Sequence, residues 1–371
     1  MKILMLLTNP FRPDPGPYKE ALSLIENGNN VEIIAWDREK KYPKSEEISG
    51  IRINRVKVKG DENNFLLHLC KLPIFYFNAF FKGLKSKCEI VHCHDLDTLP
   101  LGVIISKIKN CKIIYDAHED YVGMVEQSIP DFFSKLLEKI EIKYMKKTDS
   151  IITVNEAVVK VLKNRSDKDI EIVMNCPPLK NIPSNIKIKK ENSKFVLLYI
   201  GTIGPRRFLK ETIDIVSKNK DFELRIGGNG SYKDIILKMS EKHKNIIFLG
   251  WVKADDIIKK SMEADALFVL DSPKTRNARV GLPNKVFEAM AIGKPIIVCK
   301  DTYAGKFVEK NKCGIAIPYD EEAFVKAVME LKNNKELRSE FGKNGRKQAA
   351  EKYNWEKQEE KLIKIYEKLK K

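Results

Sequence analysis

The chain has no apolar run near the roughly 20 residues that a membrane-spanning helix needs. Its opening run, Ile-Leu-Met-Leu-Leu, is also too short for a signal peptide. Asn9 and nearby prolines end that run without a small-residue cleavage site. We therefore predict that residues 2–8 form a first β-strand rather than a targeting segment.

No CxxC pair and no metal-finger spacing occur among the seven cysteines, which lie at positions 70, 88, 93, 111, 176, 299 and 313. An odd, scattered set with several members inside apolar runs is typical of reduced thiols in a cytosolic protein. This pattern argues against a disulfide framework and against a structural zinc site of the finger type.

A concentrated block of lysine and arginine is absent too, although the formal net charge is +17. The lysines lie mostly at helical spacing beside glutamates, which favours a solvated basic surface. Membrane association is the next interpretation, and nucleic acid is not expected as a partner. The charge also suits nucleotide sugars, which are anionic.

What the chain does contain is an alternation of short apolar strands and amphipathic helices over 371 residues, enough for two domains. Strands are predicted at 2–8, 31–36, 51–58, 89–93, 112–116, 150–154, 170–174, 195–200, 222–227, 246–249, 266–270, 296–299 and 314–317. Helices are predicted between most of them, for example at 18–27, 97–108, 131–147 and 156–164. This alternation predicts an α/β fold of two Rossmann-like, doubly wound parallel-sheet domains. Two such domains facing each other across a cleft would place a ligand site in that cleft.

A stretch rich in proline, asparagine and charge separates the two halves without hydrophobic periodicity. We predict a first domain over 1–178, a linker over 179–194 and a second domain over 195–350. Residues 351–371 are predicted to form a helix that packs back toward the first domain. Its apolar stripe consists of Trp355, Leu362, Ile365, Tyr366 and Leu369.

The run from Gly281 to Pro295 is the most informative about function. It predicts a helix whose first turn carries Asn284 and Lys285, with Glu288 one turn further on. Free amides and a positive dipole at a helix start bind anions, and a carboxylate can accept two hydrogen bonds from a ribose diol. These residues therefore suit a nucleoside diphosphate, although a solvated helix surface would use the same residue types.

Other candidate residues follow predicted strands, where doubly wound sheets bind their ligands. Arg207 lies in the turn after 195–200 and could grip phosphate, or be a solvated surface residue. The glycine-rich turn after 222–227 lacks the full GxGxxG spacing and carries little weight. His118 follows 112–116 and could donate to a substrate oxygen or have a structural role.

The stretch Val91-His-Cys-His-Asp-Leu-Asp suggests a metal site, because His92 and His94 share one face of a strand. Asp95 and Asp97 could complete such a site, but no distant cluster joins them in the sequence. A pair of core histidines followed by a helix-capping aspartate is the favoured interpretation.

Residues 65–87 are unusually aromatic and end in three lysines. Aromatic side chains beside lysines suit a helix lying in the plane of a membrane, and a buried core helix is the alternative. Pro73 is expected to interrupt either one.

Together these stretches resemble family-four retaining glycosyltransferases of the GT-B architecture (group 1 type), in the branch with Pro-Asn-Lys-x-Phe-Glu. The resemblance covers nearly the whole chain. Its most specific parts are Pro283–Pro295, Gly250-Trp-Val, Ala264-Asp-Ala, His94–Gly102 and Tyr115-Asp-Ala-His-Glu.

The resemblance implies a nucleotide-diphosphate sugar on the second domain and an acceptor on the first, with no metal or cofactor required. Glu288 matches the ribose-binding glutamate, Lys285 and Arg207 match the basic pair at the diphosphate, and His118 matches the histidine near the transferred sugar. Further donor-binding positions are Gly16, Val252, Leu282 and Asn284.

Three positions depart from the commoner family pattern. Val280 stands where a second glutamate usually contacts the sugar, Thr202 stands where an arginine is frequent, and Gly16 stands alone where a double glycine is common. The Pro-Asn-Lys branch shares the first departure, which favours an active enzyme.

We expect a retaining, metal-independent transferase that acts in the cytoplasm on a saccharide or lipid-linked saccharide, with residues 65–87 in contact with the inner face of the cell membrane. A sugar-nucleotide 2-epimerase of the same architecture is the nearest alternative, with acid–base candidates Asp116, Glu119 and Asp120. A non-catalytic binder of an anionic ligand or nucleic acid is a third.

Overall fold

The structure is a computed structural model that describes residues 1–11, 14–60, 65–183 and 194–370, without the side chains of 65–69 and 255. Most of the predicted linker, 184–193, lies outside these residues. The chain divides into two compact units. Unit 1 comprises Met1–Met174 and Gln358–Lys371, and unit 2 comprises Asn175–Lys357.

Unit 1 is built on an eight-stranded sheet in the order β3-β4-β2-β1-β5-β6-β7-β8. The strands are β1 (Lys2–Leu7), β2 (Asn30–Trp36), β3 (Ser45–Ile48), β4 (Ile51–Val56), β5 (Ile90–His94), β6 (Lys112–Ala117), β7 (Ser150–Thr153) and β8 (Ile170–Ile172). All pairs are parallel except β3 with β4. Strand β3 was not predicted, because its sequence Ser-Glu-Glu-Ile lacks an apolar face.

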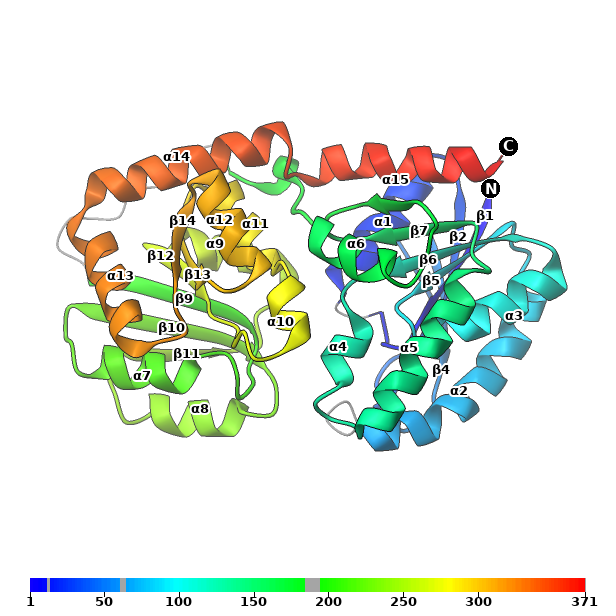
Figure 1. Cartoon of the computed structure of the whole chain (residues 1–371), viewed down its shortest axis with the longest axis horizontal. Coiled ribbons are helices and arrows are strands. Elements are labelled where there is room, and N and C mark those ends of the chain that lie inside the picture. Colours follow the sequence, from blue (N-terminus) through cyan, green and yellow to red (C-terminus); the bar gives the residue numbers. More distant parts are fainter. Residues whose placement is uncertain (12–13, 61–64, 184–193, 371) are drawn as a thin grey trace. The chain divides into compact units, whose positions relative to one another are not determined.

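Helices connect these strands in unit 1 (Figure 1). They are α1 (Pro15–Glu26), α2 (Phe65–Lys85), α3 (Leu99–Lys109), α4 (Tyr121–Val125), α5 (Asp131–Met145) and α6 (Glu156–Lys163). Strand β1 shows why the sheet is central: all its residues after Lys2 are buried, as expected for a parallel strand covered on both faces. The predicted interruption of α2 is wrong, since the helix continues through Pro73.

Unit 2 has a six-stranded parallel sheet in the order β11-β10-β9-β12-β13-β14, the strand order of a dinucleotide-binding fold. The strands are β9 (Phe195–Thr202), β10 (Phe222–Asn229), β11 (Ile246–Gly250), β12 (Ala266–Val269), β13 (Ile296–Cys299) and β14 (Gly314–Ile317). Both units are thus Rossmann-like, which confirms the prediction of two α/β domains of this fold class.

The helical elements of unit 2 are η1 (Leu179–Asn181), α7 (Leu209–Ser217), α8 (Lys233–Ser240), α9 (Ala254–Met262), α10 (Arg276–Val280), α11 (Asn284–Ile292), α12 (Tyr303–Asn311), α13 (Glu321–Asn333) and α14 (Lys335–Glu351). Side chains of Thr302, Asp320 and Asn334 accept hydrogen bonds from the first turns of α12, α13 and α14. Such N-caps fix where each helix begins.

The last helix, α15 (Trp355–Lys370), begins in unit 2 and continues in unit 1. Within unit 1 its residues Leu362, Ile365 and Tyr366 are buried, whereas Leu369 is only partly so. Gln358 of the same helix accepts a hydrogen bond from the backbone of Met174 at 3.1 Å. The apolar stripe read from the sequence is therefore largely a buried face.

Among the described residues, none of the helices combines the length and hydropathy that crossing a membrane would require. All seven cysteines are free, and four of them, Cys93, Cys176, Cys299 and Cys313, are buried.

Candidate functional site

In unit 2, the strand order reverses between β9 and β12, which pair in parallel. Ligands of doubly wound sheets bind beyond the carboxyl ends of the strands at this point. The turn after β9 carries Arg207, and Asp271 follows β12 two residues after its end. The two side chains form an ion pair. The fold therefore places Arg207, a predicted phosphate-binding residue, at the position where such sheets bind their ligands.

Lys285 reaches the same edge of the sheet from the first turn of α11. Its Nζ lies 4.7 Å from the ring centroid of Tyr199 on β9, a cation–π contact. A Cβ atom at Gly201 would overlap the Lys285 ammonium, so this glycine leaves room for the cation. We call Tyr199, Arg207, Asp271, Lys285 and Glu288 the basic site of unit 2.

The electrostatics of this site suit an incoming anion. Burial lowers the pKa of Lys285, the Glu288 carboxylate opposes this, and the Arg207 cation lowers the pKa further. Two cations that disfavour each other's charge gain most from a doubly charged ligand, because it stabilises both at once. Asp271 neutralises part of Arg207 and would have to share it with that ligand.

The remaining predicted donor residues of unit 2 lie at the start of α11 or after β11, which is separated from β9 by β10. Asn284 opens α11 and is exposed, while Leu282 is partly exposed just before it. Val252 follows β11, and its side chain would approach a Cβ at Gly227 to 2.7 Å. Val280 ends α10. The glycines of β10 have a packing role: a Cβ at Gly228 would overlap the backbone of Gly201 on β9.

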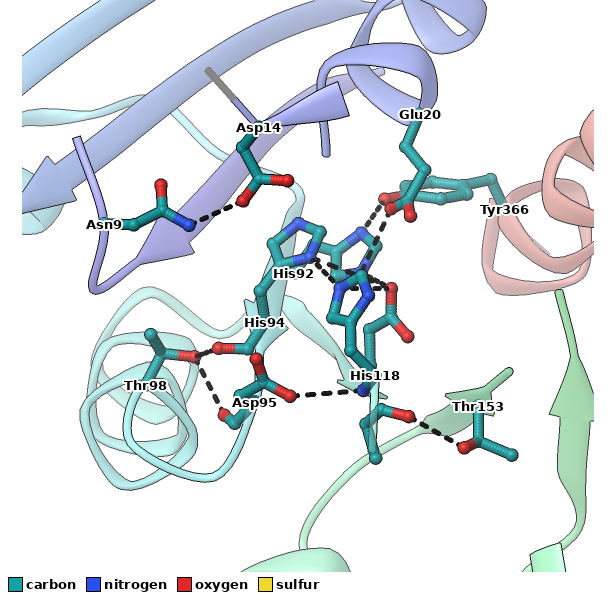
Figure 2. A network of polar contacts seen from close by, with 12 residues as sticks. Asn9, Asp14, Glu20, His92, His94, Asp95, Thr98, His118, Thr153 and Tyr366 are labelled. Atoms are coloured by element: carbon teal, nitrogen blue, oxygen red, sulfur yellow. Dashed lines mark hydrogen bonds and ion pairs between the residues drawn. The ribbon is translucent and has the colours of Figure 1, made fainter. Parts of the chain in front are cut away.

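Unit 1 places His118 directly after β6, beside His94 at the end of β5 (Figure 2). His118 Nε2 lies 2.9 Å from His94 Nδ1 and 3.5 Å from Asp116 Oδ2. His92 Nε2 lies 3.4 Å from the same Asp116 oxygen and 4.0 Å from Glu20 Oε2. We call Glu20, His92, His94, Asp116 and His118 the histidine–carboxylate cluster.

Most of the cluster is withdrawn from solvent, but the His118 side chain remains 22% exposed. Burial disfavours a charged His118, yet Asp116 and then Asp95 outweigh this and raise the pKa of His118 to about 10. Burial, together with His92 and His118, holds the pKa of His94 well below its ordinary value. A protonated His118 therefore donates to a neutral His94, and the cluster can present a hydrogen-bond donor to a substrate oxygen.

Two neighbours hold the cluster in place. The Tyr366 hydroxyl of α15 lies 2.6 Å from His92 Nδ1, and both groups are buried. Asp95 Oδ1 accepts a hydrogen bond from the His118 backbone at 3.1 Å. These contacts orient two of the three histidines (Figure 2).

Two expectations about this region are wrong. Distant residues do join the paired histidines, because parallel pairing sets His94 beside Asp116 and α1 brings in Glu20. The expected helix-capping aspartate is absent from α3 in the described structure, since Asp97 accepts from Thr8 at 2.6 Å and Asp95 binds the His118 backbone.

Gly16 lies in the first turn of α1, because the helix begins at Pro15 rather than at the predicted residue 18, and it is buried. Four residues of these sites, Glu20, Tyr199, Asp271 and Tyr366, were not predicted from the sequence. A signal existed for Glu20, which sits at helical spacing among the apolar residues Pro17, Ala21 and Leu24. Asp271 follows a strand, which is the signal used for Arg207. Tyr366 was counted only as an apolar residue.

Comparison with known proteins agrees with this architecture. Residues 18–177 match the model "Glycosyltransferase Family 4", and residues 182–348 match "Glycosyl transferases group 1". An uncharacterized glycosyltransferase of Methanocaldococcus jannaschii is 22% identical and covers 93% of this chain and 91% of its own. The alpha-monoglucosyldiacylglycerol synthase of Acholeplasma laidlawii is 24% identical over 88% of this chain and 85% of its own.

Solved structures share the fold at low sequence identity. Sucrose-phosphate synthase from Thermosynechococcus elongatus has a TM-score of 0.82 at 16% identity and covers 100% of this chain and 99% of its own. Anabaena HepE in complex with UDP-glucose has a TM-score of 0.75 at 12% identity, with 99% and 100% covered. With both domain models matched in order and named glycosyltransferases among its relatives, the chain is a glycosyltransferase that joins a family 4 domain to a group 1 domain.

Proposed function

We propose that this enzyme moves a sugar from a nucleotide-diphosphate sugar to a saccharide or lipid-linked saccharide acceptor, with retention of configuration and without a metal ion. The observation that carries the proposal is the basic site of unit 2. Arg207 and Lys285 come from separate segments, and both lie at the switch point of the sheet. Glu288 follows Lys285 by one turn of α11.

The chemistry asks this site to bear the negative charge that grows on the departing diphosphate. Two cations and the free amides at the start of α11 can do so without a metal. Glu288 then binds the ribose diol. In unit 1, His118 would donate a hydrogen bond to the transferred sugar or its acceptor.

Two relatives whose names contain an α configuration support retention: the alpha-monoglucosyldiacylglycerol synthase and a poly(ribitol-phosphate) alpha-N-acetylglucosaminyltransferase of Staphylococcus aureus. The latter is 26% identical over 84% of this chain and 60% of its own. A common donor such as UDP-glucose carries an α-linked sugar, so an α-linked product would mean retention.

A thermal-shift screen against UDP, GDP, ADP, CMP and their common sugars, with and without EDTA, tests the donor site. We expect one nucleoside diphosphate to stabilise the protein, equally with and without chelator, and less so in Lys285→Ala. A stabilisation that EDTA abolishes would refute metal independence. Release of free nucleotide that needs an acceptor would separate transfer from epimerisation.

We further propose that the acceptor is presented at the inner face of the cell membrane. Helix α2 buries Phe75 and Ala79 but exposes Ile74, Phe77 and Phe81, so it is neither wholly core nor wholly surface. Helix α3 packs beside it and exposes Ile104 and Ile108. Lysines 82, 85, 87 and 107 lie on or directly after these helices.

Exposed apolar side chains next to lysines fit an anionic lipid surface, and the net charge of +17 adds attraction. Sedimentation with anionic and neutral vesicles tests this. We expect binding to anionic vesicles at low salt that weakens in Phe77→Ser and not in Ile235→Ser, which removes an exposed apolar residue of unit 2. Equal binding of both variants would refute the assigned surface.

A further inference from the structure

Three atoms of the histidine–carboxylate cluster have the spacing of metal ligands. His94 Nδ1 and His118 Nε2 are 2.9 Å apart, and Asp116 Oδ2 lies 3.7 Å from the first and 3.5 Å from the second. Ligand atoms about 2.0–2.1 Å from a tetrahedral ion lie about 3.3–3.4 Å from one another. The triangle therefore matches one face of such a tetrahedron.

Glu20 completes the set. A ligand atom of each of Glu20, His94, Asp116 and His118 lies within 4.8 Å of the other three. Glu20 is only 5% exposed, and its Oε2 finds no hydrogen-bond donor in the described part of the chain. His92 Nε2 lies 4.0 Å from this oxygen, beyond hydrogen-bond distance. A buried carboxylate oxygen without a hydrogen-bond donor is costly, and coordination to a cation would satisfy it.

The surroundings favour a fixed geometry. His94 and Asp116 stand opposite each other in the paired strands β5 and β6, so the backbone sets their separation. His92 contacts Asp116 at 3.4 Å and is itself held by Tyr366. Support of this kind orients the ligands of a metal ion. The 22% exposure of the His118 side chain leaves a path from solvent.

We propose that Glu20, His94, Asp116 and His118 bind one divalent transition-metal cation of the zinc type. Two imidazoles and two carboxylates suit such an ion better than Mg²⁺ or Ca²⁺, which prefer oxygen ligands alone. Binding would displace the proton between His94 Nδ1 and His118 Nε2 and take both nitrogens as ligands, which leaves His118 bound to the ion. If the proposed role of His118 holds, the ion inhibits transfer, which itself needs no metal.

Cobalt(II) provides a direct readout, because a four-coordinate Co²⁺ absorbs visible light strongly. The full-length protein is stripped with chelator, dialysed and titrated with Co²⁺ without donor or acceptor, and bound Zn²⁺ is counted by mass spectrometry in a parallel sample. We expect one ion per chain. We expect His94→Gln and Glu20→Gln to lower the affinity at least tenfold and His243→Gln, a histidine of unit 2, to leave it unchanged.

The proposal would be overturned by the lack of saturable binding of one ion per chain, or by unchanged binding in Glu20→Gln and His94→Gln. The Cys88 and Cys111 sulfurs, 3.8 Å apart, are the competing ligands. Thiolate-to-cobalt bands that vanish in Cys88→Ser would assign the ion to them and equally refute the cluster. Thermal unfolding confirms that each variant is folded. Because no transfer is measured, failure of the proposed function would leave this result intact.

Discussion

Removing the Lys285 ammonium is the most direct test of how the basic site works. In Lys285→Ala the diphosphate loses one of its two cations, while Arg207, its ion pair with Asp271 and the start of α11 stay in place. Charge on the leaving group grows only in the transition state, so the loss should fall on kcat rather than on donor KM.

The size of the fall in kcat depends on the groups that still stabilise the diphosphate in Lys285→Ala. Removing one preorganised donor to a developing oxyanion lowers kcat by about 10²–10³, or about 2.7–4 kcal/mol. Lys285 is partly exposed and Arg207 can compensate for part of its charge, so we expect the lower end, about 10²-fold. Glu288→Ala should instead raise donor KM about tenfold and change kcat by less than about threefold, because ribose contacts persist throughout the reaction.

Initial rates of nucleotide release at saturating donor and acceptor give kcat for both variants. Thermal unfolding serves as the control, and Lys285→Ala should lose no stability, because burial already disfavours the lysine charge. Since the pKa of Lys285 is lowered, its charge is lost as pH rises through a value below 10.5, so kcat should fall on that alkaline side. Equal falls of kcat in Lys285→Ala and Glu288→Ala would refute this division of roles.

Three further predictions concern stability, measured as free energies of unfolding in denaturant. Arg165→Met should lower the free energy of unfolding by about 3–5 kcal/mol, because it leaves the buried carboxylates of Asp120 and Glu141 without their cation. Lys112→Met, which breaks the exposed ion pair with Asp149, is the control and should cost less than about 1 kcal/mol. Similar losses in the two variants would contradict this difference. Gly228→Ala should abolish or severely reduce stability, because its φ is 134° and a Cβ would overlap strand β9. Gly204→Ala, in open space, is the matched control and should change little. Tyr366→Phe should cost about 1–3 kcal/mol by leaving buried His92 Nδ1 without its partner, and an unchanged midpoint would show that this contact is dispensable.

The chemical character of the donor side was visible in the sequence. Asn284, Lys285 and Glu288 share one short helix, so helical spacing alone puts them within a turn of one another. The strands of both sheets could be predicted for a similar reason, because apolar runs bounded by turn residues are a local signal. The polar edge strand β3 gave no such signal and was missed.

The histidine–carboxylate cluster was decided by tertiary structure. Strand pairing set β5 beside β6, α1 brought Glu20 close to His94 and Asp116, and α15 placed Tyr366 against a histidine 274 residues earlier in the chain. Periodicity identifies the face on which each residue lies, but it carries no information about which faces meet. Which faces meet depends on how the elements pack. Packing joined the predicted core pair His92 and His94, the strand-end His118 and Tyr366 of the apolar stripe into one polar network.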